Sequence, residues 1–318
     1  MYNVAIIGAG QLGSRHLQGL KCAASPLSIT VIDSNEDALK VAKERYESIS
    51  AVGEKSVKFS KDMGSLPQEL DLVVIATSST PRAAIVKSLL NHSIVKNLIL
   101  EKVLFPKLKE YDEVDALLKA KGVRCWVNCP RRMFGSYQII KDSFTPSAPI
   151  QMEYIGKSWG LCCNAMHFID IFMYLTSEKS CSVDASGIEP IILNSKRDGY
   201  IEMNGTLFIT TPKGNTLKLT STEASEGCGY VDIKNGVGKY FALDEIHGEL
   251  TVSGKTVKVN TPYQSQMTGT LADMVLNTGF CPLTPYGESA EFHRIFIKEM
   301  LSAYNKITQQ ESDTLPIT

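Results

Sequence analysis

The stretch MYNVAIIGAGQLGSRH, residues 1–16, decides the fold of this chain. Its apolar run at residues 4–7 is typical of a parallel strand that is buried on both faces. Residues 8–13 then read G-x-G-x-x-G, and apolar residues at helical spacing follow. In a strand–turn–helix unit Gly8 makes the tight turn, Gly10 lets a pyrophosphate approach the backbone, and Gly13 lets the helix pack on the strand. We therefore expect a dinucleotide whose pyrophosphate lies on the N-terminus of this helix.

A carboxylate ends the second predicted strand. Residues 27–33 read LSITVID, which places Asp33 twenty residues after Gly13. At this distance a Rossmann unit has the acid that binds the ribose 2′-hydroxyl of the adenosine. Because a carboxylate repels a 2′-phosphate, Asp33 favours NAD over NADP. The alternative is that Asp33 caps the helix expected at residues 34–48.

The first 128 residues alternate between apolar strands and helices. Further strands are expected at residues 57–59, 72–77, 97–100 and 123–127, and helices at residues 36–48, 82–90 and 108–120. No hairpin signal interrupts this order, so it predicts α/β architecture with a doubly wound parallel sheet. We predict an NAD-binding Rossmann domain over residues 1–128.

The sequence pattern changes in residues 129–318, from alternating strands and helices to short, closely spaced strands. This change predicts a second domain of α+β type with an open, mostly antiparallel sheet. Closely spaced strands with turn signals between them are expected at residues 150–154, 200–210, 216–220, 231–233, 240–243, 250–252 and 256–259. Helices are expected at residues 164–175, 264–277 and 289–306, and the C-terminal ones could pack back on the first domain. Residues 309–313 read as a tail.

Composition narrows the class of protein. The 318 residues are 43% hydrophobic, enough for about two domains. A formal charge of -1 gives no reason to expect nucleic acid or an anionic membrane as a partner. The apolar runs are much shorter than the ~18 residues of a membrane span, and we expect no signal peptide. The eight cysteines form no C-x-x-C pair and no zinc-ligand pattern, so we expect reduced thiols, no metal site and a cytoplasmic protein.

Two stretches, one near the end of the first domain and one where the two domains meet in the sequence, carry groups suited to chemistry. Glu101 and Lys102 end a parallel strand, and doubly wound sheets bind ligands beyond that edge. A desolvated lysine there acts as an acid–base group or orients the hydroxyl that loses hydride, whereas a surface charge pair is the alternative. Asn128 with Arg131 and Arg132 suits a polar or anionic substrate such as a sugar or sugar phosphate, and plain surface arginines are the alternative.

A third stretch lies on a predicted helix of the second domain. Asn164, His167 and Asp170 are spaced three apart, so they share one helix face. Asp170 could therefore orient the imidazole of His167 or pair with it. A structural histidine is the alternative.

This series of motifs resembles the Gfo/Idh/MocA family of sugar and cyclitol oxidoreductases. The resemblance implies a Rossmann domain joined to a domain that binds substrate and whose open sheet mediates oligomerisation. It implies oxidation of a ring hydroxyl by hydride transfer to NAD(P), with Lys102 and His167 as catalytic residues. Substrate-binding residues would be Asn128, Arg131, Asn164 and Asp170, and cofactor-binding residues would be Gly8, Gly10, Gln11, Leu12, Gly13, Asp33, Thr77 and Glu101.

The chain departs from the family pattern at two positions that matter for chemistry. Val103 stands where the family has the proline of Glu-Lys-Pro, so we expect no cis bond after Lys102, since a non-proline cis bond costs about 3 kcal/mol. Cys163, four residues before His167, replaces an aspartate that is frequent in the family. Acid–base work would then fall on His167 and Lys102.

The sequence thus predicts a cytoplasmic NAD-dependent oxidoreductase. It would transfer a hydride between nicotinamide and a hydroxyl or keto group of a sugar, nucleotide-sugar or polyol. The alternatives are a non-catalytic NAD-binding sensor or regulatory protein, suggested by the missing proline and aspartate, and a reductase of C=C or C=N bonds. We expect a small-molecule substrate and a homo-oligomer, dimer or tetramer, without nucleic acid or membrane partners.

Overall fold

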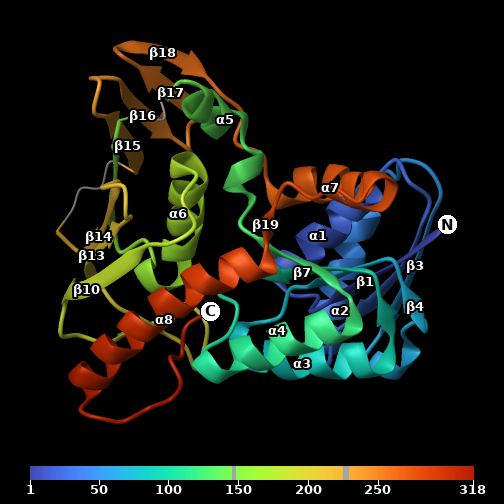
Figure 1. Ribbon diagram of the computed structural model, residues 1–318. Helices are drawn as coiled ribbons and strands as arrows, with labels where there is room; N and C mark the ends of the chain where they lie inside the picture. Colours follow the sequence, from blue (N-terminus) through green and yellow to red (C-terminus); the bar gives the residue numbers. More distant parts are fainter. Residues whose placement is uncertain (145–147, 225–228) are drawn as a thin grey trace. The chain divides into compact units, whose positions relative to one another are not determined.

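The computed structural model describes residues 1–144, 148–224 and 229–318 and divides the chain into two units (Figure 1). The first unit comprises Met1–Phe105, Lys109–Asn128 and Pro262–Tyr286. The second comprises Pro106–Leu108, Cys129–Thr261 and Gly287–Thr318. The chain therefore leaves the first unit after Asn128 and returns to it at Pro262.

A seven-stranded sheet forms the centre of the first unit, in the order β19-β8-β7-β5-β1-β2-β3. The strands are β1 (Tyr2–Ile7), β2 (Leu27–Ile32), β3 (Lys55–Ser60), β5 (Leu72–Ile75), β7 (Asn97–Glu101), β8 (Arg124–Asn128) and β19 (Thr284–Pro285). All neighbours are parallel except β19 and β8. Since β2 and β3 extend from one side of β1 and the later parallel strands from the other, the predicted doubly wound parallel sheet is confirmed.

The helices of the first unit cover both faces of this sheet. They are α1 (Gln11–Lys21), α2 (Glu36–Glu47), α3 (Ser79–His92), α4 (Leu108–Lys121) and α7 (Gln264–Thr278), with a short 3-10 helix η1 (Met63–Ser65) and a separate strand pair β4 (Glu69–Leu70) and β6 (Ile94–Val95). Figure 1 shows α1 and α7 along one face and α3 and α4 along the other. Because helices cover both faces, every residue of β5 is buried, which explains its unbroken apolar run.

Helix α7 packs against α1 at backbone contact. A Cβ on Gly269 would lie 2.6 Å from the carbonyl oxygen of Gly19, and a Cβ on Gly19 would lie 2.6 Å from Cβ of Thr268. The carboxylate of Asp273 also accepts hydrogen bonds from the backbone N–H groups of Ala24 and Ser25, at 2.7 and 2.9 Å. These contacts fix α7 in the first unit although it follows the sheet of the second unit in sequence.

An eight-stranded sheet forms the centre of the second unit, in the order β10-β13-β14-β9-β15-β16-β17-β18. Its strands are β9 (Ile150–Lys157), β10 (Ser182–Ile188), β13 (Gly205–Thr210), β14 (Thr216–Thr222), β15 (Tyr230–Asn235), β16 (Tyr240–Asp244), β17 (Glu249–Val252) and β18 (Lys255–Lys258). Only β9 and β14 are parallel among the neighbours in this described sheet, so the mostly antiparallel sheet is confirmed.

The prediction of a single strand at residues 200–210 is wrong. The structure has β12 (Ile201–Glu202), which pairs with β11 (Leu193–Asn194), and then β13. The break falls before Gly205, whose φ is +124°, and a Cβ there would lie 2.4 Å from the carbonyl oxygen of Gly187. This close approach, opposite a register shift in β10, ends one strand and starts the next.

Helix α6 (Leu161–Thr176) packs on β14 in the second unit, which also contains η2 (Pro130–Met133), α5 (Gly135–Asp142) and most of α8 (Tyr286–Thr308). Glu202 caps the N-terminus of α6, because its carboxylate accepts from the N–H groups of Cys162 at 2.8 Å and Cys163 at 3.2 Å. Strand β13 alternates, with Leu207 and Ile209 buried and Phe208 exposed on the opposite face. That alternation is typical of a sheet covered on one face.

The expectation of a tail at residues 309–313 is also wrong. The side chain of Asn305 donates to the carbonyl oxygen of Ser312 at 3.0 Å and accepts from its N–H at 3.1 Å. Beyond this turn Leu315 is fully buried, and its N–H donates to the carbonyl oxygen of Pro106. Within the part of the chain that the structure describes, no helix combines the length and apolar character that a membrane crossing requires.

Candidate functional site

The glycine loop joins β1 to α1 in a conformation that two of its glycines require. Gly8 has a φ of +95°, and a Cβ there would lie 2.7 Å from the backbone nitrogen of Thr77. A Cβ on Gly13 would lie 1.7 Å from the carbonyl oxygen of Gly8. A Cβ on Gly10, in contrast, would meet no heavy atom within 4 Å. The loop thus closes tightly on the sheet and leaves open space only at Gly10 among its three motif glycines.

The N-terminus of α1 is suited to an anion. Gly10 is its N-cap residue, no side chain caps the helix, and its first turn contains no acidic residue. The first N–H groups of a helix, here those of Gln11, Leu12 and Gly13, have no partner within the helix, and the helix dipole makes this end positive. Arg45 adds a guanidinium nearby, which donates to Oε1 of Gln11 at 2.8 Å. A pyrophosphate fits these donors.

Asp33 lies beside this loop and does not cap the next helix. Its Oδ2 accepts from the N–H of Ala9 at 2.7 Å, and its Oδ1 accepts from the N–H of Asn35 at 2.8 Å. Asn35 is the residue that caps α2, since its side chain accepts from the N–H groups of Asp37 and Ala38. Each carboxylate oxygen of Asp33 has a further lone pair, so the group can still accept from sugar hydroxyls. The residues present therefore fit a dinucleotide.

The peptide bond between Lys102 and Val103 is cis, so the expectation that this bond is not cis is wrong. Arg82 of α3, only 1% exposed, donates to the carbonyl oxygens of Val103 and Leu104. It also donates to the carbonyl oxygen of Thr77, which follows β5. One buried guanidinium therefore holds the segments after β5 and β7. No local pattern in the sequence marks Arg82, which directly follows Pro81 in the first turn of α3.

A closed ring of hydrogen bonds surrounds Glu101 at the end of β7. Its Oε1 accepts from Nδ2 of Asn128 at 2.6 Å and lies 2.9 Å from Nε2 of His16. Nδ1 of His16 lies 3.0 Å from Oγ1 of Thr268, which also accepts from Nε2 of Gln264 at 3.0 Å. Oε1 of Gln264 accepts from Asn128 at 2.9 Å and completes the ring. Glu101 and Asn128 are each only 2% exposed.

The ring keeps Glu101 ionised in a buried position. Burial by itself raises the pKa of Glu101, but the hydrogen bond and charge of His16, the hydrogen bond of Asn128 and the charge of Lys102 together hold it below its usual value. Of the five residues in the ring, only Glu101 and Asn128 are candidate site residues from the sequence alone. Gln264 and Thr268 come from α7, and nothing local connects them with the glycine loop.

In the second unit, Asp170 of α6 pairs with Arg132. Oδ2 of Asp170 accepts from Nε of Arg132 at 2.8 Å, and Oδ1 accepts from Nη2 at 3.1 Å. Asp170 is fully buried, and Arg132 also contacts Glu288 at 3.2 Å. Although burial acts to lower the pKa of Arg132, Asp170 and Glu288 raise it. Both oxygens of Asp170 are thus engaged by a guanidinium.

Arg131 is paired in the same way with Glu245. Its Nε and Nη2 donate to the two carboxylate oxygens of Glu245 at 2.7 and 2.6 Å. Tyr137 donates a further hydrogen bond to Glu245 at 2.7 Å, and the guanidinium of Arg131 lies 4.5 Å from the ring centre of Phe168. Since both arginines bind carboxylates of their own unit, little positive charge remains there for an anionic substrate.

Asn164 and His167 lie one turn apart on α6. Nδ2 of Asn164 donates to the carbonyl oxygen of Trp159 at 2.9 Å, and His167 is half-buried with its Nδ1 enclosed. Cys163 donates through Sγ to the carbonyl oxygen of Thr318. The structure therefore places His167, Asn164 and Asp170 on one helix, as expected. However, the amide of Asn164 and the carboxylate of Asp170 already bind groups of the protein.

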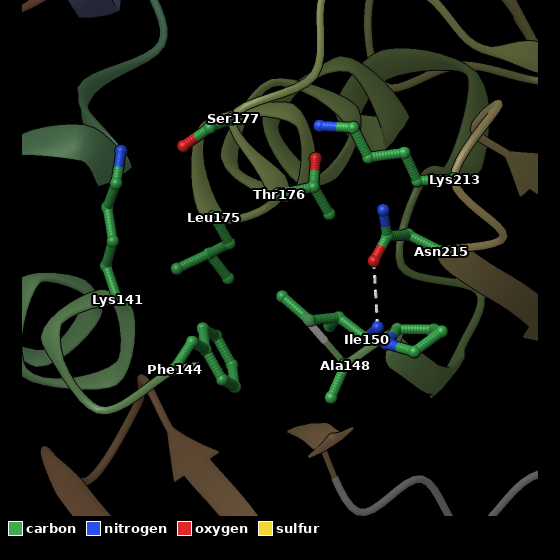
Figure 2. A pocket seen from close by; sticks show the side chains of 10 residues that line it. Lys141, Phe144, Ala148, Ile150, Leu175, Thr176, Ser177, Lys213 and Asn215 are labelled. Carbon is green, nitrogen blue, oxygen red and sulfur yellow. Dashed lines mark hydrogen bonds between the residues drawn. The ribbon is translucent and has the colours of Figure 1, made fainter. Parts of the chain in front are cut away.

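A cavity of about 340 Å³ lies at the C-terminal end of α6 (Figure 2). Figure 2 shows Lys141 and Lys213 on opposite sides of it, with Phe144 and Leu175 between them. None of the site residues expected from the sequence lines this cavity. Within residues 1–144, 148–224 and 229–318, no three His, Cys, Asp or Glu side chains are grouped so as to hold a metal ion.

The doubly wound sheet, the open Gly10 and the uncapped N-terminus of α1 together define a dinucleotide-binding protein of the Rossmann class. Residues 2–129 match the family model GFO_IDH_MocA, described as an oxidoreductase family with an NAD-binding Rossmann fold. The N-terminal part of the chain is therefore similar to the Rossmann domain of the Gfo/Idh/MocA oxidoreductases.

Solved structures resemble the chain over nearly its full length. An oxidoreductase from Agrobacterium radiobacter, in complex with NAD+, L-tartaric acid and magnesium, is 15% identical with a TM-score of 0.72, covering 96% of this chain and 97% of that one. UDP-N-acetylglucosamine 3-dehydrogenase GnnA from Acidithiobacillus ferrooxidans is 14% identical with a TM-score of 0.72, covering 96% and 99%. Biliverdin reductase from Synechocystis sp. PCC 6803, in complex with biliverdin and NADP+, is 14% identical with a TM-score of 0.70, covering 95% and 98%. These likenesses establish the fold, and no curated protein sequence matches the chain.

Two alanine substitutions in the glycine loop separate folding from cofactor binding. Gly10→Ala adds a methyl group in open space, so it lowers the free energy of unfolding by about 1 kcal/mol at most, as expected for alanine at an N-cap. The same methyl group obstructs the pyrophosphate and weakens NAD+ binding by about tenfold or more. Gly13→Ala is the matched contrast, because its Cβ overlaps Gly8 and destabilises the protein by about 1–3 kcal/mol or more. Denaturant unfolding and calorimetric titration measure both quantities. Unchanged NAD+ affinity in Gly10→Ala would show that no dinucleotide approaches this glycine.

Proposed function

We propose that this protein is an NAD-dependent oxidoreductase that acts on a CH–OH group, transferring a hydride between nicotinamide and a hydroxyl or keto group of a sugar, nucleotide-sugar or polyol. The observation that carries this proposal is the open Gly10 beside an uncapped helix N-terminus and Asp33, in a chain that matches an oxidoreductase family. The structural likeness to a UDP-N-acetylglucosamine dehydrogenase ranks sugar nucleotides high among substrates to test.

The cofactor would lie along the carboxyl ends of the parallel strands. Its pyrophosphate would bind at Gly10 and at the N–H groups of Gln11, Leu12 and Gly13, and its adenosine ribose at Asp33. Gly8 makes the turn that directs these groups. Thr77 and Glu101 follow or end β5 and β7, so we assign them to the nicotinamide half. When bound, nicotinamide supplies the acceptor or donor of the hydride.

Asp33 is expected to set the preference for NAD over NADP. Asp33→Ala removes charged hydrogen bonds to the ribose, each worth about 1.5–3 kcal/mol, so NAD+ binding weakens about ten- to a hundredfold. NADP+ binding stays constant or improves, because the carboxylate that repels its 2′-phosphate is gone. Asn35→Ala is the control: it removes the cap of α2 and leaves the carboxylate in place. Calorimetric titration of both variants with both cofactors measures the preference, and an equal loss for NAD+ and NADP+ in Asp33→Ala would remove Asp33 from this role.

Lys102 and His167 are the residues that we assign to proton transfer. In the oxidation direction the substrate hydroxyl loses its proton to one of them as its C–H hydride leaves. For His167 the accepting atom is Nε2, because Nδ1 is enclosed in the protein. Asn128, Arg131, Asn164 and Asp170 would bind or surround the substrate, and the carboxylate partners of the arginines favour an uncharged polar group at that point.

Lys102→Met and His167→Asn should each lower kcat about 10²–10⁴-fold, the range for loss of a general acid–base group. Lys43→Met, which removes the charge of an exposed lysine on α2, should leave turnover unchanged. NADH formation with a panel of sugars, nucleotide-sugars and polyols measures activity, and circular dichroism checks that the variants fold. Full activity in either variant would exclude that residue from proton transfer.

The same panel decides between the proposal and its alternatives. NAD+ binding without turnover of any panel member would support a sensor or regulatory protein. Substrates with C=C or C=N bonds extend the panel, with NADH consumption as the readout. Turnover confined to these substrates would support a reductase, and a biliverdin reductase is among the structures similar to this chain. The match to an oxidoreductase family favours catalysis over sensing.

The cysteines fit a reducing compartment, and we therefore place the protein in the cytoplasm. Within the described residues no cysteine forms a disulfide bond, and Cys228 lies outside these residues. Burial raises the pKa of Cys281 to about 12 and of Cys181 to about 11. Thiols of this kind are inert at neutral pH.

We propose that a second copy of the chain covers the outer face of the eight-stranded sheet. Phe208 is 45% exposed and Tyr240 is 36% exposed there, and both line a cavity of about 410 Å³ on that face. The face also carries the ion pair of Lys218 with Glu153, so it offers both charges to a symmetric partner.

Sedimentation of the wild-type protein should give a dimer or tetramer, and Phe208→Lys should shift the protein towards monomer. Ile246→Lys changes an apolar side chain that is 79% exposed in the β16–β17 turn and should have no effect. A monomeric wild-type protein would contradict the proposal.

A further inference from the structure

In the ring of five side chains that includes Glu101, the carboxylate determines which atoms donate and which accept. A carboxylate only accepts hydrogen bonds, so Asn128 must present its Nδ2 to Glu101. The same Nδ2 donates to Oε1 of Gln264, which leaves Nε2 of Gln264 to donate to Oγ1 of Thr268. The orientation of both amides thus follows from one buried charge.

His16 donates to Glu101 whichever protonation state it has. Its Nε2 faces an oxygen that cannot donate, so this nitrogen carries a hydrogen. Its Nδ1 lies 3.0 Å from Oγ1 of Thr268 and 3.5 Å from Nε2 of Gln264, so Nδ1 can accept in a neutral imidazole and can donate to Oγ1 in a charged one. The hydroxyl of Thr268 also donates to the backbone carbonyl oxygen of Gln264 at 3.0 Å. His16 is fully buried on α1, so this hydrogen bond cannot be replaced by bulk water.

Glu101 needs this donor because its carboxylate is charged and buried. It also directly precedes Lys102, which we assign to proton transfer. A buried carboxylate is stable only when donors or a cation compensate its lost hydration. Asn128 and His16 supply donors to the same oxygen of Glu101, and Lys102 directly follows in the chain. If His16 no longer donates, Lys102 is the neighbouring cation towards which the carboxylate would turn.

We propose that His16 is a positioning residue: by holding the carboxylate of Glu101, it sets the direction in which Lys102 leaves the end of β7. The inference rests on the proposed function, because that function gives Lys102 its role at the substrate. His16 itself touches neither the substrate nor the reacting atoms. The ring also ties Asn128, where the chain leaves the first unit, to Gln264, just after it returns.

Competitive acylation measures the position of Lys102 without cofactor or substrate. The purified full chain is treated with a trace of acetic anhydride at about pH 9, where a buried carboxylate such as Glu101 remains ionised. Peptide mass spectrometry then gives the labelling rate of Lys102 relative to Lys119, a lysine that is 75% exposed. His16→Asn retains a polar group near Thr268 but is too short to reach Glu101. We expect this variant to slow labelling of Lys102 by about threefold or more, because Glu101 draws the ammonium group towards itself.

Three further variants make the result specific. His16→Gln extends an amide N–H to the place of Nε2 and should restore labelling to near the wild-type rate. Leu17→Ala creates a cavity at the neighbouring, fully buried residue of α1 and should leave the relative labelling of Lys102 unchanged. His16→Leu provides a second loss of the donor should His16→Asn fail to fold. Unchanged labelling in the donor-free variant, or equal slowing in Leu17→Ala, would overturn the positioning role.

The outcome is independent of whether the proposed function holds. A wild-type protein that binds no NAD+ overturns the function, while the labelling rates still report on His16 and Lys102. In an active enzyme, His16→Asn should lower kcat about tenfold with the KM for NAD+ nearly constant, since the pyrophosphate and ribose contacts are intact. A rise in KM with constant kcat would contradict positioning of Lys102.

Discussion

The contact between Gly13 and the carbonyl oxygen of Gly8 is the constraint on which the first unit depends. Because no side chain fits between them, α1 begins directly at the end of β1 and directs its first N–H groups to the open space at Gly10. The same helix then meets α7 at Gly19, again at backbone distance. One helix thus presents an anion site at its start and carries His16 to the carboxylate of Glu101 one turn later.

Both units contain carboxylates of low exposure that accept hydrogen bonds from other side chains of the protein. Glu101 accepts hydrogen bonds from the amide of Asn128 and the imidazole of His16. Asp170 and Glu245 each bind the guanidinium group of an arginine. Several charged residues that look from the sequence like substrate ligands therefore act first within the protein. Under the proposed function, chemistry at the substrate would rest on Lys102 and His167, and binding of the cofactor would rest mainly on backbone N–H groups and Asp33.

How much the sequence could predict depended on the range of the interactions. The six parallel strands of the first sheet, the glycine loop and the acid after β2 were predictable, because apolar runs and glycine spacing are local signals. The contacts of Arg82 with segments after β5 and β7, and of Gln264 with Asn128, join residues far apart in the chain. The pairing of Asp170 with Arg132 is of the same kind, since η2 must pack beside α6 to form it. No local pattern contains such information.

The most direct test of the central claim is a fluorescence titration of the wild-type protein with NADH. We predict saturable binding at one site per chain, with a dissociation constant in the range of about 1 μM to 1 mM that is usual for enzyme ligands. We also predict competition by NAD+, since both forms would occupy the same loop. No binding of NADH at concentrations up to about 1 mM would contradict an oxidoreductase built on this glycine loop.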